Sequence, residues 1–166
     1  ASISVNVQSP LESSWRNKYN DPKYEAGRIV ERSDDFLSQK FGIEFNVTSQ
    51  PYWTVGKATA AGGILKDAAK KHWKRKEDLM IAFADTEDRA IFGVAFNGKP
   101  FSLIFDHSYK QNCKSTQHEV GHTYGLQHCT DTCVMKSGWD DNWELFDHLC
   151  SSHEQQWNKN KNKYHH

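Results

Sequence analysis

Residues 118–128 read His-Glu-Val-Gly-His-Thr-Tyr-Gly-Leu-Gln-His and contain the strongest structural signal of the chain. On a helix, His118 and His122 lie one turn apart, so both imidazoles leave the same face with about 5–6 Å between their Cβ atoms. His128 lies too far along for a straight helix to bring it to the same point. We therefore expect the helix to end near Gly125, because glycine tolerates the positive φ that a sharp turn requires.

Three histidines that converge in this way are typical ligands of Zn²⁺, which in catalytic sites takes three protein ligands and leaves a fourth position to water. We predict that His118, His122 and His128 bind one catalytic zinc ion. Glu119 directly follows the first ligand, which places its carboxylate beside the metal without making it a ligand. We predict that Glu119 is the general base that takes a proton from a metal-bound water and passes it to the leaving amine. Alternatively, the two helical histidines are core residues and Glu119 caps the helix.

The spacing of the three histidines, followed by a methionine, resembles that of the metzincin zinc peptidases. The resemblance implies that Met135 forms a methionine turn beneath the metal. Within this group the chain is most similar to archaemetzincins, in which one cysteine follows the third histidine and another stands two residues before the methionine. His128-Cys129 and Cys133-Val134-Met135 match both features.

The order of apolar patterns predicts an α/β fold of the α+β type. Alternating or continuous apolar stretches predict strands at 3–7, 43–47, 79–83, 91–96 and 101–105. Helical spacing predicts helices at 24–41, 58–76 and 143–157, besides the helix that carries the histidines. The resemblance implies a metzincin-like mixed, twisted sheet with two backing helices, an active-site helix and a small C-terminal subdomain that ends in a helix.

Residues 91–96 and 101–105 are joined by Asn97-Gly98, a strong turn signal, and should form a hairpin. The resemblance implies that 91–96 is an edge strand that lines the cleft and pairs with extended substrate. The apolar character of this stretch would suit a buried interior strand equally well.

The length of 166 residues fits a single catalytic domain, residues 1–166. By the resemblance, residues 1–128 form an upper subdomain and residues 129–157 a lower one. Residues 158–166 should be a loose tail, because 158–163 contain no apolar side chain.

The charge and hydropathy of the chain limit its partners. With 21 basic and 21 acidic residues, the chain offers no global electrostatic attraction for nucleic acid. No apolar run approaches the roughly 20 residues that span a membrane. We expect a peptide or protein substrate, no nucleic acid, no membrane insertion and a monomer.

Two accounts are open for the four cysteines, Cys113, Cys129, Cys133 and Cys150. An even number in a chain that begins with alanine favours two disulfides, Cys129–Cys133 and Cys113–Cys150, in a secreted or extracellular protein. In archaemetzincins, however, four cysteines bind a second, structural zinc ion. The corresponding ligands here would be Cys129, Cys133, Cys150 and His153, which leaves Cys113 as a free thiol.

The remaining candidates are weaker. After Met135, the resemblance implies that Trp139 or Trp143 limits the pocket for the residue after the scissile bond, although both could simply pack the lower subdomain. Asp140-Asp141 lack the spacing of calcium ligands, so we expect no calcium site. We expect the other single histidines to be structural or exposed: His72, His107 and His148.

Taken together, these features predict a zinc-dependent metalloendopeptidase that hydrolyses peptide bonds. One alternative is an aminopeptidase of the archaemetzincin type. The other is a non-catalytic zinc-binding pseudo-peptidase, against which Glu119 argues, because metal binding alone does not require that carboxylate.

Overall fold

A computed structural model describes residues 2–137 and 145–166 of the chain. The strands are β1 Ile3–Gln8, β2 Leu11–Glu12, β3 Ile43–Ser49, β4 Tyr52–Trp53, β5 Leu79–Ala84, β6 Gly93–Ala95 and β7 Phe101–Phe105. The helices are α1 Ser13–Arg16, α2 Pro22–Ser33, α3 Asp35–Phe41, α4 Ala61–His72, α5 Tyr109–Thr123 and α6 Ser151–Asn160. Among the described helices, none has the length and apolar character needed to cross a membrane.

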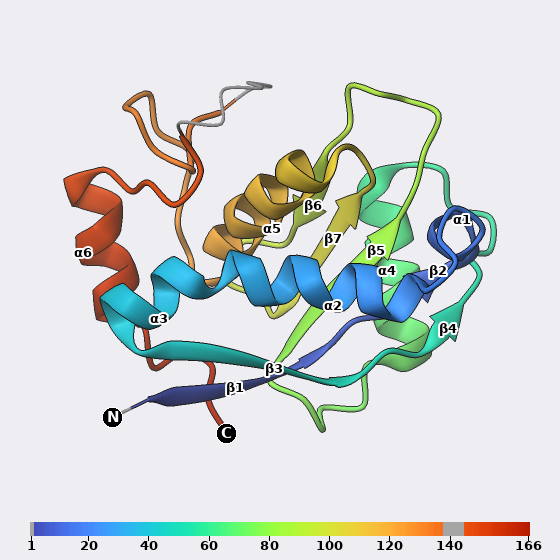
Figure 1. Cartoon of the computed structure of the whole chain (residues 1–166), viewed down its shortest axis with the longest axis horizontal. Helices are drawn as coiled ribbons and strands as arrows, with labels where there is room; N and C mark the ends of the chain where they lie inside the picture. The colour runs from blue at the N-terminus through green and yellow to red at the C-terminus, as the bar shows by residue number, and fades with distance from the viewer. Residues whose placement is uncertain (1, 138–144) are drawn as a thin grey trace.

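The strands form one mixed sheet, shown in Figure 1. β1 pairs in parallel with β3 on one side and with β5 on the other. β2 continues the path of β1 beyond Pro10 and pairs with β5 and β4. β7 lies beside β5 in parallel, and β6 pairs with β7 in the antiparallel direction. Since β7 is its one partner among the described strands, β6 is an edge strand.

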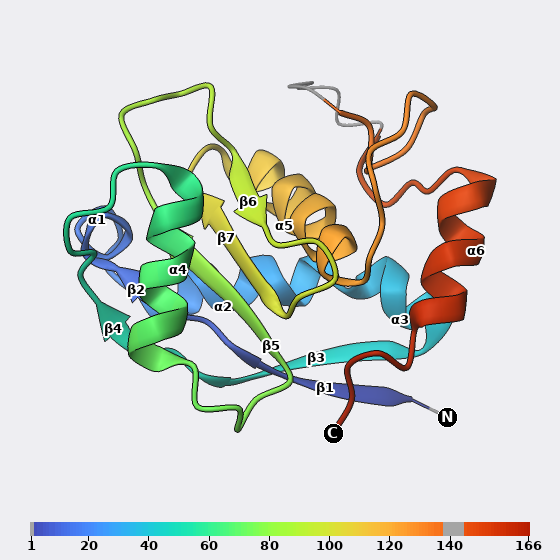
Figure 2. The ribbon, with the colours of Figure 1, turned by 180° about the vertical axis from the view of Figure 1, so that it is seen from behind.

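Helices cover both faces of this sheet, as the two opposite views in Figures 1 and 2 show. Every residue of β5 is buried, because its alternate side chains enter two different hydrophobic clusters. Ile81 and Phe83 pack with residues of α2, α3 and α5, whereas Met80 and Ala82 pack with residues of α4. The helix α5 therefore lies on the opposite face of the sheet from α4.

Two of the expected helices have different bounds. The helix expected at 24–41 is divided into α2 and α3 at Asp34, whose side chain accepts a hydrogen bond from the backbone N–H of Phe45 at 2.8 Å. This contact with a following strand is not encoded in helical periodicity. The helix expected at 58–76 is shorter and ends at His72, because the backbone of Trp73 is extended.

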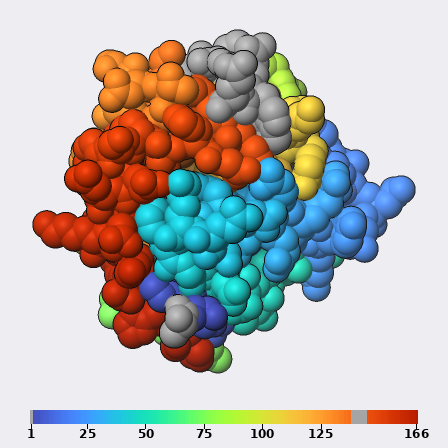
Figure 3. All heavy atoms as spheres, turned by 60° about the vertical axis from the view of Figure 1, so that its left-hand side comes forward, coloured from blue at the N-terminus to red at the C-terminus, as the bar shows by residue number. Residues whose placement is uncertain are grey.

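The C-terminal part of the chain also differs from expectation. The last helix is α6 Ser151–Asn160 rather than 143–157; residues 143 and 144 lie outside the described part. The expectation of a loose tail at 158–166 is wrong. Asn160 Nδ2 donates to the carbonyl of Tyr124 at 2.9 Å, and the buried hydroxyl of Tyr164 donates to the carbonyl of Thr123 at 2.7 Å. Figure 3 shows this C-terminal segment against the first strand.

Candidate metal centre

The helix α5 carries His118 and His122 and ends just before the turn that brings His128 back toward them. Its N-terminus is capped by Ser108, whose hydroxyl accepts a hydrogen bond from the backbone N–H of Gln111 at 3.1 Å. At the other end Gly125 has φ +94°, and the N–H of Leu126 donates to the carbonyl of Gly121 at 3.0 Å. The sharp turn at Gly125 expected from the sequence is present, and it returns the chain toward the helix face.

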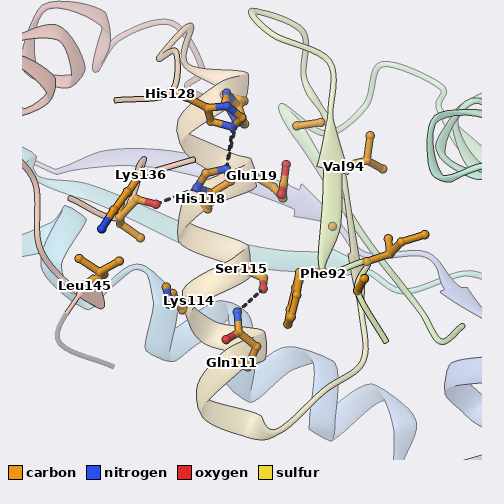
Figure 4. Close-up of a pocket in the computed structure, with 16 residues that line it drawn as sticks. Phe92, Val94, Gln111, Lys114, Ser115, His118, Glu119, His128, Lys136 and Leu145 are labelled. Atoms are coloured by element: carbon orange, nitrogen blue, oxygen red, sulfur yellow. Dashed lines mark hydrogen bonds between the residues drawn. The ribbon is translucent and has the colours of Figure 1, made fainter. Parts of the chain in front are cut away.

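Three imidazole nitrogens converge at this turn, as Figure 4 shows for two of them. The Nε2 atom of His118 lies 3.2 Å from Nε2 of His128 and 3.2 Å from Nε2 of His122. The distance between Nε2 of His122 and Nε2 of His128 is 3.1 Å. The structure therefore brings together the three histidines that the sequence proposes as ligands.

The Nδ1 atoms, which point away from the cluster, determine the tautomer of His118 and His122. Nδ1 of His118 lies 2.7 Å from the carbonyl oxygen of Val134, and Nδ1 of His122 lies 2.7 Å from that of Leu126. Because a carbonyl oxygen can only accept, both Nδ1 atoms carry the proton, and in the neutral rings both Nε2 atoms present lone pairs. Burial lowers the pKa of His118 to about 4 and also lowers the pKa of His122, which favours the neutral form.

This arrangement fits a zinc ion. In a tetrahedron with Zn–N distances of about 2.0–2.1 Å, neighbouring nitrogens are separated by about 3.3–3.4 Å, close to the observed 3.1–3.2 Å. Lone pairs that face one another at this distance repel in the absence of a cation. The described residues form two groups that could hold a metal ion, and these three histidines are one of them.

Glu119 lies between α5 and the edge strand β6. A Cβ atom at Gly93 would lie 2.8 Å from Cγ of Glu119, 3.0 Å from its Oε2 and 3.0 Å from the carbonyl oxygen of Leu103. Glycine at this position therefore permits the strand to approach the glutamate. The Glu119 side chain faces β6 in Figure 4, and its burial raises the pKa of the carboxyl group to about 8.

Met135 packs against the turn of α5 that carries the first two histidines. It is fully buried, and a Cβ atom at Gly121 would collide with its Sδ. Its carbonyl accepts a hydrogen bond from the N–H of Cys129 at 3.1 Å. The turn that contains Met135 also supplies the Val134 carbonyl that orients His118. The methionine thus packs beneath the helix, with its Sδ against Gly121.

The three histidines and Glu119 open into a pocket of about 500 Å³. Its two longest walls are the segment 90–95, which includes β6, and one side of α5. By the alternation of an antiparallel ladder, backbone groups of Gly93 and Ala95 face away from β7. An extended chain could pair with this edge.

The four cysteines do not form the expected disulfides, because each is a free thiol in the structure. Cys113 is fully buried in α5, and its carbonyl accepts a hydrogen bond from the hydroxyl of Ser33. The pairings Cys129–Cys133 and Cys113–Cys150 are therefore wrong for this structure. The physical reason is that the fold places Cys129, Cys133 and Cys150 close to the imidazole of His153 instead.

That second group lies on the loop after His128, the methionine turn and the start of α6. The ligand atoms all lie within 4.8 Å of one another and belong to Cys129, Cys133, Cys150 and His153. Nδ1 of His153 is 3.1 Å from Sγ of Cys150 and 3.6 Å from Sγ of Cys133. These are the four residues that the sequence offered as the alternative to disulfides.

Several contributors were not identified from the sequence. Asn97 Nδ2 donates to the Leu126 carbonyl at 2.9 Å, and the N–H of Gly98 donates to the His122 carbonyl at 2.8 Å. The hairpin turn thus contacts the end of α5. A glycine inside a strand signals close approach of another group, so Gly93 was recognisable in principle. Asn97 carries no such signal beyond its role in the turn.

The other sequence candidates lie elsewhere. His107 stacks on Phe92, with ring centroids 4.1 Å apart, and its Nε2 donates to the carbonyl of Ile91 at 2.9 Å. His72 belongs to α4, and the carbonyl of His148 accepts from the N–H of Val134. The remaining expectations fall outside the described residues: Trp139, Asp140, Asp141 and Trp143.

One family of known proteins matches the segment that carries these residues. A family model described as Peptidase family M54 matches residues 99–151, which include all of α5 and both cysteine-bearing loops. No curated protein sequence matches the chain.

Three similar solved structures share the fold at low sequence identity. Archaemetzincin from Methanopyrus kandleri is 15% identical, with a TM-score of 0.69 and 95% of each chain covered. Metalloproteinase-II from Bacteroides fragilis is 14% identical, with a TM-score of 0.65 over 95% of this chain and 53% of that one. A protein solved in a chaperone-substrate complex is 13% identical, with a TM-score of 0.72 over 99% of this chain. The present chain spans 35% of the length of that protein.

These structures confirm the mixed α/β fold expected from the sequence. The family match covers the segment that contains the histidines, and the described cluster of nitrogen ligands agrees with it. The chain is thus similar to Peptidase family M54 over residues 99–151, and it shares its fold with archaemetzincin and metalloproteinase-II.

Proposed function

We propose that this chain is a zinc-dependent endopeptidase in which His118, His122 and His128 hold the catalytic zinc and Glu119 is the general base. The observation that carries the proposal is the convergence of three Nε2 atoms within 3.1–3.2 Å, beside a buried carboxyl group and an edge strand. A pseudo-peptidase would need the three nitrogens but not the carboxyl group.

In this proposal the metal ion, the groups that orient its ligands and Glu119 have separate chemical roles. When bound, zinc supplies a Lewis acid that polarises the scissile carbonyl and makes a water molecule more acidic. The carbonyls of Val134 and Leu126 hold the two helical imidazoles in the orientation that binds metal. The positive charge of a bound zinc ion would lower the pKa of Glu119 from the value that burial alone gives, so that its carboxylate can accept a proton from the attacking water and return it to the leaving amine.

Substrate orientation follows from the edge strand. A substrate paired with the free edge of β6 lies extended across the pocket, with its backbone held by main-chain hydrogen bonds. This mode of binding does not require a free amino terminus, which favours an endopeptidase over an aminopeptidase.

A peptide blocked at both ends tests the proposal. We expect the zinc-loaded protein to cleave it, and we expect Glu119→Ala to retain zinc while losing about 10²–10⁴-fold of the rate. Substantial cleavage by Glu119→Ala would exclude the proposed base. Cleavage restricted to peptides with a free amino terminus would establish the aminopeptidase alternative.

We further propose that Cys129, Cys133, Cys150 and His153 hold a second, structural zinc. A Cys₃His set is a common structural ligand combination, and sulfur and nitrogen ligands in a zinc tetrahedron lie about 3.6 Å apart. The observed Sγ–Nδ1 distances of 3.1 and 3.6 Å support this assignment. The ion would join the loop after His128, the methionine turn and α6.

A further inference from the structure

A second hollow lies on the side of the sheet that α4 covers. Its volume is about 770 Å³, and its lining residues come from the C-terminal half of α4, the segment that follows it and the turn that joins β6 to β7. We call it the basic hollow and define it by six of its lining residues: Lys66, Trp73, Arg75, Phe96, Lys99 and Phe101.

The floor of the basic hollow is aromatic. The rings of Trp73 and Phe101 meet edge to face with centroids 5.3 Å apart, and those of Phe96 and Phe101 do so at 6.4 Å. All three side chains are half-buried. The rings therefore hold one another in a fixed arrangement and leave apolar surface accessible within the hollow.

The rim of the basic hollow is strongly cationic, although the whole chain has a formal charge of zero. Residues 66–76 contain six lysines and arginines and a single acidic residue, Asp67. Asp67 is already engaged, because it pairs with Lys71 at 2.9 Å and accepts a hydrogen bond from Nε1 of Trp53 at 2.9 Å.

The next two acidic residues in the chain also have partners away from the hollow. Glu77 accepts a hydrogen bond from Ser49, and Asp78 accepts one from the N–H of Asn6. Within the described part of the chain, six basic side chains of the rim and of the segment next to it form no ion pair: Lys66, Lys70, Lys74, Arg75, Lys76 and Lys99. Their charge is thus available to an anionic partner.

The basic hollow lies on the α4 face of the sheet, opposite α5, but it begins at the end of the strand that lines the proposed catalytic cleft. Residues 90–95 line the pocket that holds Glu119, and the next residue, Phe96, lines the basic hollow. A chain that extends along the free edge of β6 and passes the end of this strand at Phe96 would come to the hollow, since an extended strand advances about 3.3 Å per residue.

We propose that the basic hollow is a secondary substrate-binding site for an acidic segment that carries an aromatic or aliphatic side chain, within the same polypeptide that lies along β6. Acidic side chains pair with Lys66, Arg75 and Lys99, and the apolar side chain enters between Trp73 and Phe101. This proposal rests on the proposed peptidase function and names a class of its substrates.

The shape of the surface favours a polypeptide over an anionic membrane. The exposed large hydrophobic side chains of the described residues are Tyr24 and Tyr52, and neither lines the hollow. An apolar concavity accepts a side chain, whereas insertion into a membrane requires apolar groups that project outward.

Binding of a peptide that is not cleaved tests this site separately from catalysis. The probe is a labelled peptide of alternating Glu and Phe, measured by fluorescence anisotropy with Glu119→Ala so that turnover does not interfere. We expect the double variant Lys66→Glu/Lys99→Glu, in the same background, to bind it about tenfold more weakly. The matched control, Lys159→Glu/Lys161→Glu, makes the same charge change on and beside α6 and should bind as tightly as its parent.

Two further measurements complete the test. Thermal unfolding of both double variants shows whether they are folded, and Arg75→Glu provides a second charge reversal at the rim that should also weaken binding. Equal affinity of the parent and the folded rim variants would overturn the proposal. So would rim-dependent binding of phosphatidylserine vesicles or single-stranded DNA in preference to the peptide. Cleavage of a blocked peptide by the zinc-loaded wild-type protein separately reports whether the peptidase function itself is correct.

Discussion

The amide Nδ2 of Asn97 lies 2.9 Å from the carbonyl oxygen of Leu126, the same oxygen that accepts a hydrogen bond from Nδ1 of His122 at 2.7 Å. A turn of the β6–β7 hairpin therefore supports the carbonyl that orients one imidazole of the proposed metal site. The N–H of Gly98 strengthens the connection, because it donates to the carbonyl of His122 itself.

Removal of this support should weaken metal binding. Loss of a group that orients a metal ligand commonly costs about 10–100-fold in affinity, and we expect an effect of this size on zinc binding at the histidine site in Asn97→Ala. Competition with a chelator of known affinity measures it. Asn46→Ala, which removes an exposed contact to Ser4, is the control and should have wild-type affinity. Equal affinities would show that the backbone alone holds the Leu126 carbonyl.

Gly121 should be required for the packing of Met135. In Gly121→Ala the new methyl group would collide with Sδ of Met135 and lie 3.4 Å from Trp157. We expect a loss of about 1–3 kcal/mol of unfolding free energy, the usual effect of overpacking a core. Gly27→Ala is a matched control, because a Cβ atom there has no neighbour within 4 Å and alanine favours the helix. Urea denaturation of both variants decides whether Met135 can move aside at low cost.

Gly93→Ala should impair catalysis rather than metal binding. The added methyl group would press on the Glu119 side chain and on the carbonyl of Leu103. We expect kcat for a blocked peptide to fall about tenfold or more, because a displaced base transfers protons inefficiently, while the zinc content stays at the wild-type value. Gly62→Ala, where the nearest atom lies at an ordinary contact distance of 3.9 Å, serves as the reference. Loss of zinc from Gly93→Ala would instead indicate a wider distortion of the site.

The number of zinc ions per chain in cysteine variants tests the proposed structural site. We expect the purified protein to contain two zinc ions per chain, and Cys150→Ser to contain one, because it removes a ligand of the proposed structural site. Cys113→Ser should keep both ions, since Cys113 belongs to neither metal-binding group. Elemental analysis gives the count. Equal zinc content in wild type and Cys150→Ser would contradict the structural site.

The buried Asp34 predicts a specific pH dependence of stability. Burial raises the pKa of its carboxyl group to about 6, despite the hydrogen bond from the N–H of Phe45. In the unfolded chain this pKa is about 3.9, so the folded state binds the proton more tightly. Stability from this group is therefore fully present below about pH 4 and is lost as the pH rises toward about 6.

Asp34→Asn should remove this contribution, because an amide does not titrate and its oxygen can still accept the bond from Phe45. The pH-dependent difference in unfolding free energy between wild type and variant should reach about 3 kcal/mol at most. Urea titrations between about pH 4 and 7 measure it, and the difference between the two curves cancels other groups. Parallel curves would mean that Asp34 titrates alike in both states.

The sequence by itself determined the features whose geometry is local. His118 and His122 are fixed relative to each other by helical spacing, and Gly125 turns the chain within three residues of His128, so one short segment predicts the convergence of their nitrogens. The apolar strand β5 and the Asn97-Gly98 turn were predictable for the same reason, since burial on both faces and turn conformation each leave a local pattern.

Only the tertiary structure decided how distant segments meet. The grouping of Cys129, Cys133 and Cys150 around His153 replaced the expected disulfides because the loop after His128, the methionine turn and the start of α6 fold to one point. Asp34 interrupts a helix to bind β3, and Tyr164 binds the last turn of α5. Hydropathy patterns record which side chains are buried, but the partner of a buried polar group is set by packing between elements far apart in the chain.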